Sequence, residues 1–122
     1  MNAVKLKAAE KISFRPGNLK DAQRMCEIDR ACFEPGISYT IEIFYYHLLI
    51  NRDPSFVAVH DGRIVGFILT SRSAKATSLL VTIDIMEGWR RQGLGTKLLQ
   101  IAEQAQKKRG CRTIKLQVDV EN

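Results

Sequence analysis

Two glycines separated by one residue lie in a basic segment, 90–95, which reads Arg-Arg-Gln-Gly-Leu-Gly. Glycine at positions 93 and 95 lets the backbone turn tightly and brings its N–H groups close to a ligand. Apolar residues then recur at helical spacing, so the segment leads into a helix start, which supplies free N–H donors and a partial positive charge. These features favour a cradle for a pyrophosphate group. The alternative that two glycines alone leave open is a solvated strand-to-helix turn.

This segment differs from two familiar phosphate-binding motifs. Gly88 and Gly93 nearly reproduce the Walker spacing, but Leu94 stands where that motif requires lysine. The sequence contains no G-x-G-x-x-G pattern. Sites for nucleoside triphosphates and for dinucleotides are therefore disfavoured.

Alternating apolar residues predict five strands, over 11–15, 56–59, 64–70, 79–85 and 113–120. Asp61-Gly62 joins the second strand to the third and is a strong hairpin signal. A polar stretch over 71–77 is expected to connect the third strand to the fourth. In the fourth strand, alternation places Leu79, Val81, Ile83 and Ile85 on one face and Leu80, Thr82, Asp84 and Met86 on the other.

Helical spacing predicts three helices. The first is capped by Asn18, with Asp21 in its first turn, and ends near Cys32. The residues at near-helical apolar spacing in it are Leu19, Ala22, Met25, Cys26, Ile28 and Asp29. Ser38 or Thr40 caps the second helix, which runs toward Asn51. The third begins near Leu94 and ends in a basic run before Gly110, which suits the negative end of the helix dipole.

The predicted fold class is α/β, in the order strand, helix, helix, strand, strand, strand, helix, strand. The hairpins make the central sheet mostly antiparallel, and helices flank it. The fourth strand, the third helix and the fifth strand form a crossover unit with parallel strands. We expect a single domain over residues 1–122, with 1–10 as a flexible N-terminal extension.

Composition excludes several classes of protein. The chain has 122 residues, 45% hydrophobic and 26% charged, which suits one globular core. Cys26, Cys32 and Cys111 include no C-x-x-C pair, which argues against a disulfide framework and a zinc site, so no metal is predicted. No apolar run approaches the ~20 residues that span a bilayer, and the N-terminus has no signal-peptide core. We therefore expect a cytoplasmic protein without membrane contact.

The net charge of +6 is concentrated near the end of the chain. Residues 90–122 hold eight basic and three acidic side chains, which is +5 of the total. This charge favours a polyanionic ligand, either a nucleic acid or a phosphate-rich cofactor, although a solvated basic face explains it equally well. The aromatic residues are mostly in apolar positions rather than among the basic ones, so there is no strong nucleic-acid signal.

The glycine segment resembles the acyl-coenzyme A site of the GNAT superfamily of N-acetyltransferases, whose motif is Arg/Gln-x-x-Gly-x-Gly/Ala between a long strand and an apolar helix. Other segments that resemble the family are 28–33 with Pro35, 56–67 and 116–122. The resemblance extends from Ile12 to Asn122 and is strongest to ribosomal-protein-alanine N-acetyltransferases and archaeal N-terminal acetyltransferases. It implies an acetyl-CoA-dependent N-acetyltransferase that acts on a primary amine, a protein N-terminal α-amine or a small amine, by direct transfer in a ternary complex.

The resemblance also assigns roles to residues. It implies that the main chain of Ile83 and Ile85 pairs with the pantetheine arm. The loop of Ile37, Ser38 and Tyr39 is expected to shape the acceptor groove. The pyrophosphate is expected to bind the main-chain N–H groups from Arg91 to Thr96, with Arg90 at the first motif position, so the pyrophosphate set is Arg90, Arg91, Gln92, Gly93, Leu94, Gly95 and Thr96.

The sequence departs from the family at its catalytic positions. Relatives carry a glutamate, regarded as the base, where this chain has Gln117, and an amide cannot accept that proton. Asp84 and Glu87 are the remaining candidates for a base, directly or through a water. Relatives continue into a further helix, which holds a tyrosine thought to protonate the leaving thiolate, and into a closing hairpin. We therefore expect a C-terminally truncated version of the fold.

The expected truncation bears on the oligomeric state and on the acetyltransferase hypothesis given above. An unpaired fifth-strand edge favours a homodimer formed through that edge. The absent glutamate and tyrosine also allow a second hypothesis, a coenzyme A-binding remnant without turnover. A third, less favoured hypothesis is a basic module that binds nucleic acid or the ribosome.

Overall fold

The computed structural model describes residues 11–33, 36–51, 53–74 and 76–116. Its strands are β1 (Ile12–Pro16), β2 (Ser55–His60), β3 (Arg63–Ala74), β4 (Thr77–Ile85) and β5 (Thr113–Leu116). Its helices are η1 (Leu19–Asp21), α2 (Ala22–Cys32), α3 (Ile41–Tyr45), η2 (Tyr46–Asn51) and α4 (Leu94–Lys108). The predicted end of the last strand, residues 117–120, lies outside the described residues, and so does Gln117.

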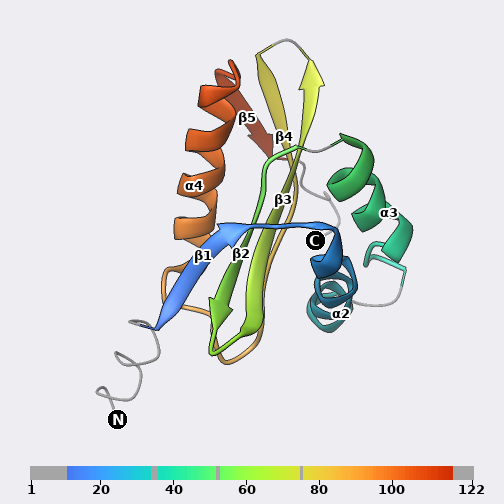
Figure 1. Ribbon diagram of the computed structural model, residues 1–122, viewed down its shortest axis with the longest axis vertical. Helices are drawn as coiled ribbons and strands as arrows, with labels where there is room; N and C mark the ends of the chain where they lie inside the picture. The colour runs from blue at the N-terminus through green and yellow to red at the C-terminus, as the bar shows by residue number, and fades with distance from the viewer. Residues whose placement is uncertain (1–10, 34–35, 52, 75, 117–122) are drawn as a thin grey trace.

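The five strands form one sheet in the order β1-β2-β3-β4-β5. Every neighbouring pair is antiparallel except β4 and β5, which are parallel. Helix α4 covers one face of the sheet, and α2 and α3 cover the other (Figure 1). This confirms the predicted α/β class with a mostly antiparallel sheet. Within the described ranges, no helix is long and apolar enough to cross a membrane.

The first helical segment begins with a capping box, as the predicted Asn18 cap requires. The Asn18 side chain accepts the Lys20 N–H (2.9 Å), and the Asp21 carboxylate accepts the Asn18 N–H (2.9 Å). Arg15 of β1 also donates to Asp21 (2.8 Å). Burial opposes ionisation of Asp21, but these hydrogen bonds outweigh it and lower the pKa of the carboxyl. The cap therefore fastens β1 to the start of α2.

The second predicted helix is present, but only Ile41–Tyr45 is α-helical. Thr40 is its N-cap residue, yet no side-chain capping bond is made there. The Tyr46 N–H is shared between the carbonyls of Glu42 and Ile43, and from this point the turn widens into the π-helix η2. Sequence spacing does not separate an α-helix from a single π-turn, so this change was not predicted.

Two apolar clusters hold the helices on the sheet. The α2-side cluster contains Ala22, Met25, Cys26, Ile28, Phe44, Val57, Ile64, Phe67 and Leu69. The α4-side cluster contains Ala58, Val65, Ile68, Leu94, Leu98 and Ala102. In the first cluster, Phe44 makes edge-to-face ring contacts with Tyr39 and Phe67, at centroid distances of 6.3 and 5.8 Å. The sheet is thus packed on both faces, which gives the segments at its ends a rigid support.

The connection predicted over 71–77 is wrong, because the β3–β4 hairpin extends through most of it. Strand β3 continues to Ala74, and β4 begins at Thr77. The Ser78 hydroxyl donates to the Ser71 carbonyl (3.2 Å). Main-chain hydrogen bonds sustain the ladder here without an apolar alternation, so the sequence pattern gave no signal.

The predicted faces of β4 are also wrong at one point. Pairing with β3 skips Val81, which is therefore the extra residue of a β-bulge. Val81 packs against the α2-side cluster, whereas Ile83 and Ile85 pack against the α4-side cluster. For the same reason Leu80 and Met86 lie on opposite faces rather than one. Strict alternation holds only where no bulge interrupts the ladder.

Strand β3 approaches β4 closely at Gly66, and this contact yields a prediction. A Cβ at Gly66 lies 2.7 Å from Ile85 Cδ1 and 3.1 Å from the Asp84 carbonyl. We expect Gly66→Ala to lower the free energy of unfolding by about 1–3 kcal/mol, the usual range for overpacking, measured by urea denaturation. Ile85→Val removes the crowded methyl group, so the cost of Gly66→Ala should shrink in that background. An equal cost in both backgrounds would refute the contact.

Candidate active site

The loop between β4 and α4 is wound by residues in the left-handed region. Gly88, Arg91 and Gly93 have φ angles of 92°, 62° and 81°. Left-handed residues among right-handed ones turn successive N–H groups toward one side and form an anion-binding nest. Arg91 adopts this conformation although it is not glycine, which stores local strain of the kind found at binding sites. The loop therefore has the winding that an anion-binding nest requires.

The start of α4 adds further donors to this loop. Lys97 is the first residue whose N–H reaches back to the turn, donating to the Gly93 carbonyl (3.0 Å). The N–H groups of Leu94, Gly95 and Thr96 therefore have no partner within the helix. The buried Leu94 side chain anchors this turn in the α4-side cluster. These three N–H groups are therefore held in fixed positions and can donate to a bound ligand.

An open hollow of about 390 Å³ lies beside the loop, lined by Glu87, Gly88, Arg90, Arg91 and Gln92. Apart from its chain neighbours, no described residue lies within 4 Å of a Cβ placed on Gly93, so the space beside it is open. Arg90, Arg91 and Thr96 are exposed, and Gln92 is half-buried. The space, the amides and the two guanidinium groups suit a pyrophosphate.

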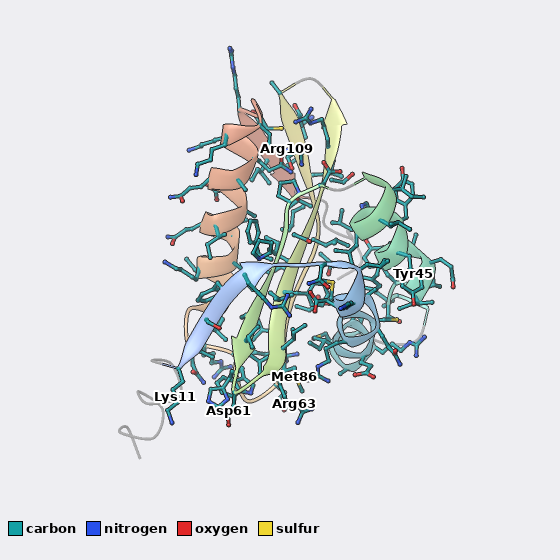
Figure 2. The ribbon with its side chains drawn as sticks, in the orientation of Figure 1. Lys11, Tyr45, Asp61, Arg63, Met86 and Arg109 are labelled. Atoms are coloured by element: carbon teal, nitrogen blue, oxygen red, sulfur yellow. The ribbon has the colours of Figure 1, made fainter. Side chains whose placement is uncertain are left out.

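The loop is held at one end of the sheet. Met86, where the loop begins, lies at the same end as Asp61 of the β2–β3 turn and Arg63 at the start of β3, opposite Arg109 (Figure 2). The Trp89 ring lies against His60, with 4.6 Å between centroids. The loop therefore rests on the β2–β3 hairpin as well as on α4.

Near the end of β4, the N–H and carbonyl groups of alternate residues point away from β3. Met86 donates its N–H to the Val65 carbonyl (2.9 Å), so the N–H and carbonyl of Ile85 point the other way. Ile83, two residues earlier, has the same orientation. The Ile85 carbonyl accepts Arg90 Nε (2.8 Å) and lies 3.5 Å from the Cys32 thiol. Burial raises the pKa of Cys32, which keeps it a thiol.

The expected acceptor loop reaches the same strand. Ile37 is exposed, and Ser38 and Tyr39 are half-buried. The Tyr39 hydroxyl donates to the Val81 carbonyl at the bulge (3.4 Å), and the Tyr39 N–H donates to Asp29 (2.6 Å). Burial, with the nearby carboxyl groups, raises the pKa of Tyr39. The candidate donor and acceptor surfaces therefore meet along β4.

The candidate bases have contrasting surroundings. Asp84 is 2% exposed, and burial together with the adjoining Asp29 carboxyl raises its pKa to about 8. It therefore holds its proton at neutral pH. Glu87 is exposed in the loop and lines the hollow. Gln117 lies outside the described residues.

Sequence reasoning missed the importance of Asp29. It is fully buried on α2. Its carboxylate accepts the Tyr39 N–H, and it adjoins the Asp84 carboxyl, whose pKa it raises. The sequence did contain a sign of this role, because Asp29 lies on the predicted apolar face of a helix. A carboxylate in such a position needs a buried partner. The partner lies 55 positions along the chain, which spacing alone does not reveal.

Comparisons with known proteins identify the family of this chain. Residues 22–122 match the model of the Acetyltransferase (GNAT) family, and the chain belongs to that family. The enzyme class, an N-acetyltransferase, and acetyl-CoA as acetyl donor are thereby confirmed. An N-alpha-acetyltransferase of Sulfurisphaera tokodaii is 28% identical over 118 residues, which cover 88% of this chain and 70% of the relative. N-alpha-acetyltransferase 30 of Schizosaccharomyces pombe is 29% identical over 110 residues, 85% of this chain and 69% of the relative.

Solved structures share the fold. The Escherichia coli ribosomal-protein-S18-alanine N-acetyltransferase superposes with a TM-score of 0.77 and 21% identity, covering 91% of this chain and 69% of that one. The diaminobutyrate acetyltransferase of Paenibacillus lautus, in complex with its substrate and coenzyme A, has a TM-score of 0.78 and 23% identity, covering 91% and 68%. A GNAT acetyltransferase of Brucella melitensis, in complex with acetyl-CoA, has a TM-score of 0.75 and 20% identity, covering 89% and 77%.

Two glycines of the cradle are expected to respond differently to alanine. Gly93 is left-handed, so Gly93→Ala should lower the free energy of unfolding by about 1–2 kcal/mol. Gly95 is inside α4, and its nearest contact to an added Cβ is an ordinary 3.8 Å to Ile83, so Gly95→Ala should raise stability by about 0.5–1 kcal/mol. Denaturant unfolding measures both. Equal effects would contradict the described winding of the loop.

Proposed function

We propose that this chain acetylates a primary amine, specifically the α-amine of a protein N-terminus, by direct transfer from acetyl-CoA in a ternary complex. The observation that carries the proposal is the set of amides from Arg91 to Thr96 at the start of α4. A pyrophosphate there meets free N–H donors, the positive end of the helix dipole and two exposed guanidinium groups. The pantetheine arm then follows the main chain of Ile85 and Ile83 along β4.

The acceptor is proposed from the loop that ends at Tyr39. Because Tyr39 bonds to Val81, this loop borders the part of β4 that the donor is expected to reach. Phe33 and Ile37 are 36% and 46% exposed and offer apolar surface to the first side chains of a peptide. Both curated relatives carry the name N-alpha-acetyltransferase, which supports an α-amine over a small-molecule amine.

The reaction needs a neutral amine beside a thioester. The amine attacks the thioester carbonyl, the carbon–sulfur bond breaks, and the proton lost by the amine is balanced by one taken up by the leaving thiolate. Positioning the two reactants supplies up to about 7–11 kcal/mol of the barrier reduction. Of the two described carboxyl candidates, Glu87 is the exposed one, so it is the one that a water molecule or the substrate amine can reach.

Titration calorimetry with acetyl-CoA tests the donor site. We expect the parent chain to bind and Arg91→Glu to lose at least tenfold in affinity, because the change puts a negative charge beside the pyrophosphate. Lys20→Glu is the matched control, since it makes the same change of charge on the exposed surface of η1 and should retain the parent affinity. An equal loss in both variants would show a general charge effect instead of a site.

A free-thiol assay with a peptide that starts with alanine tests the chemistry. Released coenzyme A thiol that depends on the peptide's free α-amine supports N-terminal acetylation. An N-terminally blocked copy of the peptide is the control and should release none. Binding of acetyl-CoA with no thiol release from the peptide or from small amines would indicate a coenzyme A-binding protein without turnover. Homodimerisation through the β5 edge stays a separate prediction, checked by light scattering.

A further inference from the structure

Two buried carboxyl groups from distant parts of the chain lie next to each other, Asp29 on α2 and Asp84 on β4. Asp29 is 0% exposed and Asp84 is 2% exposed. The Asp29 carboxyl adjoins that of Asp84 and, together with burial, raises the pKa of Asp84. Two ionised carboxylates in contact repel strongly where water is excluded, so such a pair is stable only when a proton lies between them.

Each carboxyl has one oxygen that is already hydrogen-bonded and one that is available to hold this proton. One oxygen of Asp29, Oδ2, accepts the Tyr39 N–H (2.6 Å), and one oxygen of Asp84, Oδ1, accepts the Thr82 hydroxyl (2.9 Å). The remaining oxygens, Asp29 Oδ1 and Asp84 Oδ2, are buried and have no partner among the described residues. A proton held between these two oxygens satisfies both.

Among the described residues, neither Asp29 nor Asp84 forms an ion pair. The charged or titratable groups that face it are Tyr39 from the acceptor loop, Cys32 from α2 and Arg90 from the loop after β4. Arg90 is held elsewhere, since its guanidinium donates to the Ile85 carbonyl and to the Cys32 sulfur. On β3, the residue paired with Asp84 is Phe67. The shared proton is therefore the main source of attraction within the pair.

We propose that Asp29 and Asp84 are a positioning pair that shares one proton, and that this proton holds the acceptor loop, residues 36–40, against β4. Asp29 connects the pair to the loop through the Tyr39 N–H, and Tyr39 connects the loop to β4 through the Val81 carbonyl. When the proton leaves, two like charges separate and the Tyr39 amide loses its fixed acceptor. Neither carboxyl lines the hollow beside the α4 cradle, so we expect the affinity for acetyl-CoA to stay constant. Only the identity of the loop as the acceptor groove rests on the proposed function.

The direction of the pH effect follows from burial. The unfolded chain releases the Asp84 proton near pH 4, whereas the folded chain retains it to about pH 8. Because the raised pKa belongs to the folded state, the pair's contribution to stability is complete below pH 4 and is lost as the pH rises through 8. The Asp21 carboxyl, whose pKa is lowered, contributes in the opposite direction.

The first test needs no turnover. Carbon-13 NMR of labelled aspartate carboxyl groups, with nitrogen-15 NMR of the Tyr39 amide, follows the folded protein between pH 5 and 10. We expect one aspartate carboxyl to titrate near pH 8 and the Tyr39 amide shift to move at the same pH. Asp84→Asn supplies an amide donor in place of the proton, so both changes should disappear while the fold and the Tyr39 contact remain. Asp21→Asn, at the other end of α2, should leave both changes in place.

A second test measures the KM for the acceptor peptide as a function of pH. In the parent chain the KM for the acceptor peptide should rise severalfold above pH 8, while acetyl-CoA affinity from calorimetry stays constant. Asp84→Asn should abolish that rise, and Asp84→Ala, which removes the donor altogether, should raise the acceptor KM at pH 7 and lower the melting temperature. Aspartates that all titrate near pH 4, or a Tyr39 amide unmoved near pH 8, would overturn the proposal. If no thiol is released in the assay, the proposed function is wrong. The NMR titration would still show whether Asp29 and Asp84 share a proton.

Discussion

The extra residue in β4 is the constraint on which the arrangement of the site depends. Because Val81 takes no partner on β3, the side chains before and after it change faces. Ile83 and Ile85 then support α4 and its cradle, whereas Asp84 points back to α2. Strand β4 therefore supports the candidate donor site from one face and holds the candidate acceptor loop from the other.

The parts of this fold that follow from short-range chemistry were predictable. The Asn18 cap, the Asp61-Gly62 hairpin and the left-handed Gly93 each reflect a rule that acts over a few residues. The crossover from β4 through α4 to β5 followed from the order of the elements. The candidate cradle was therefore located from the spacing of two glycines and the apolar residues after them.

Features that depend on long-range pairing were not predictable in the same way. The bulge at Val81 is set by the register between two strands, and the extension of β3 to Ala74 is sustained by main-chain bonds that any residue can make. The contact of Asp29 with Asp84 arises only when α2 packs on the sheet. In each case the deciding interaction joins residues that the linear pattern treats separately.

The hydrogen bond from Arg90 to the Ile85 carbonyl has a thermodynamic consequence for donor binding. A ligand that pairs with this carbonyl must displace the guanidinium, so one hydrogen bond is exchanged for another and little net free energy is gained at that atom. In the proposed site, the freed guanidinium would be available to a phosphate of the ligand, with which a charge-assisted bond is stronger. Arg90 would then keep the Ile85 carbonyl hydrogen-bonded until the ligand binds and turn its donors to the ligand afterwards.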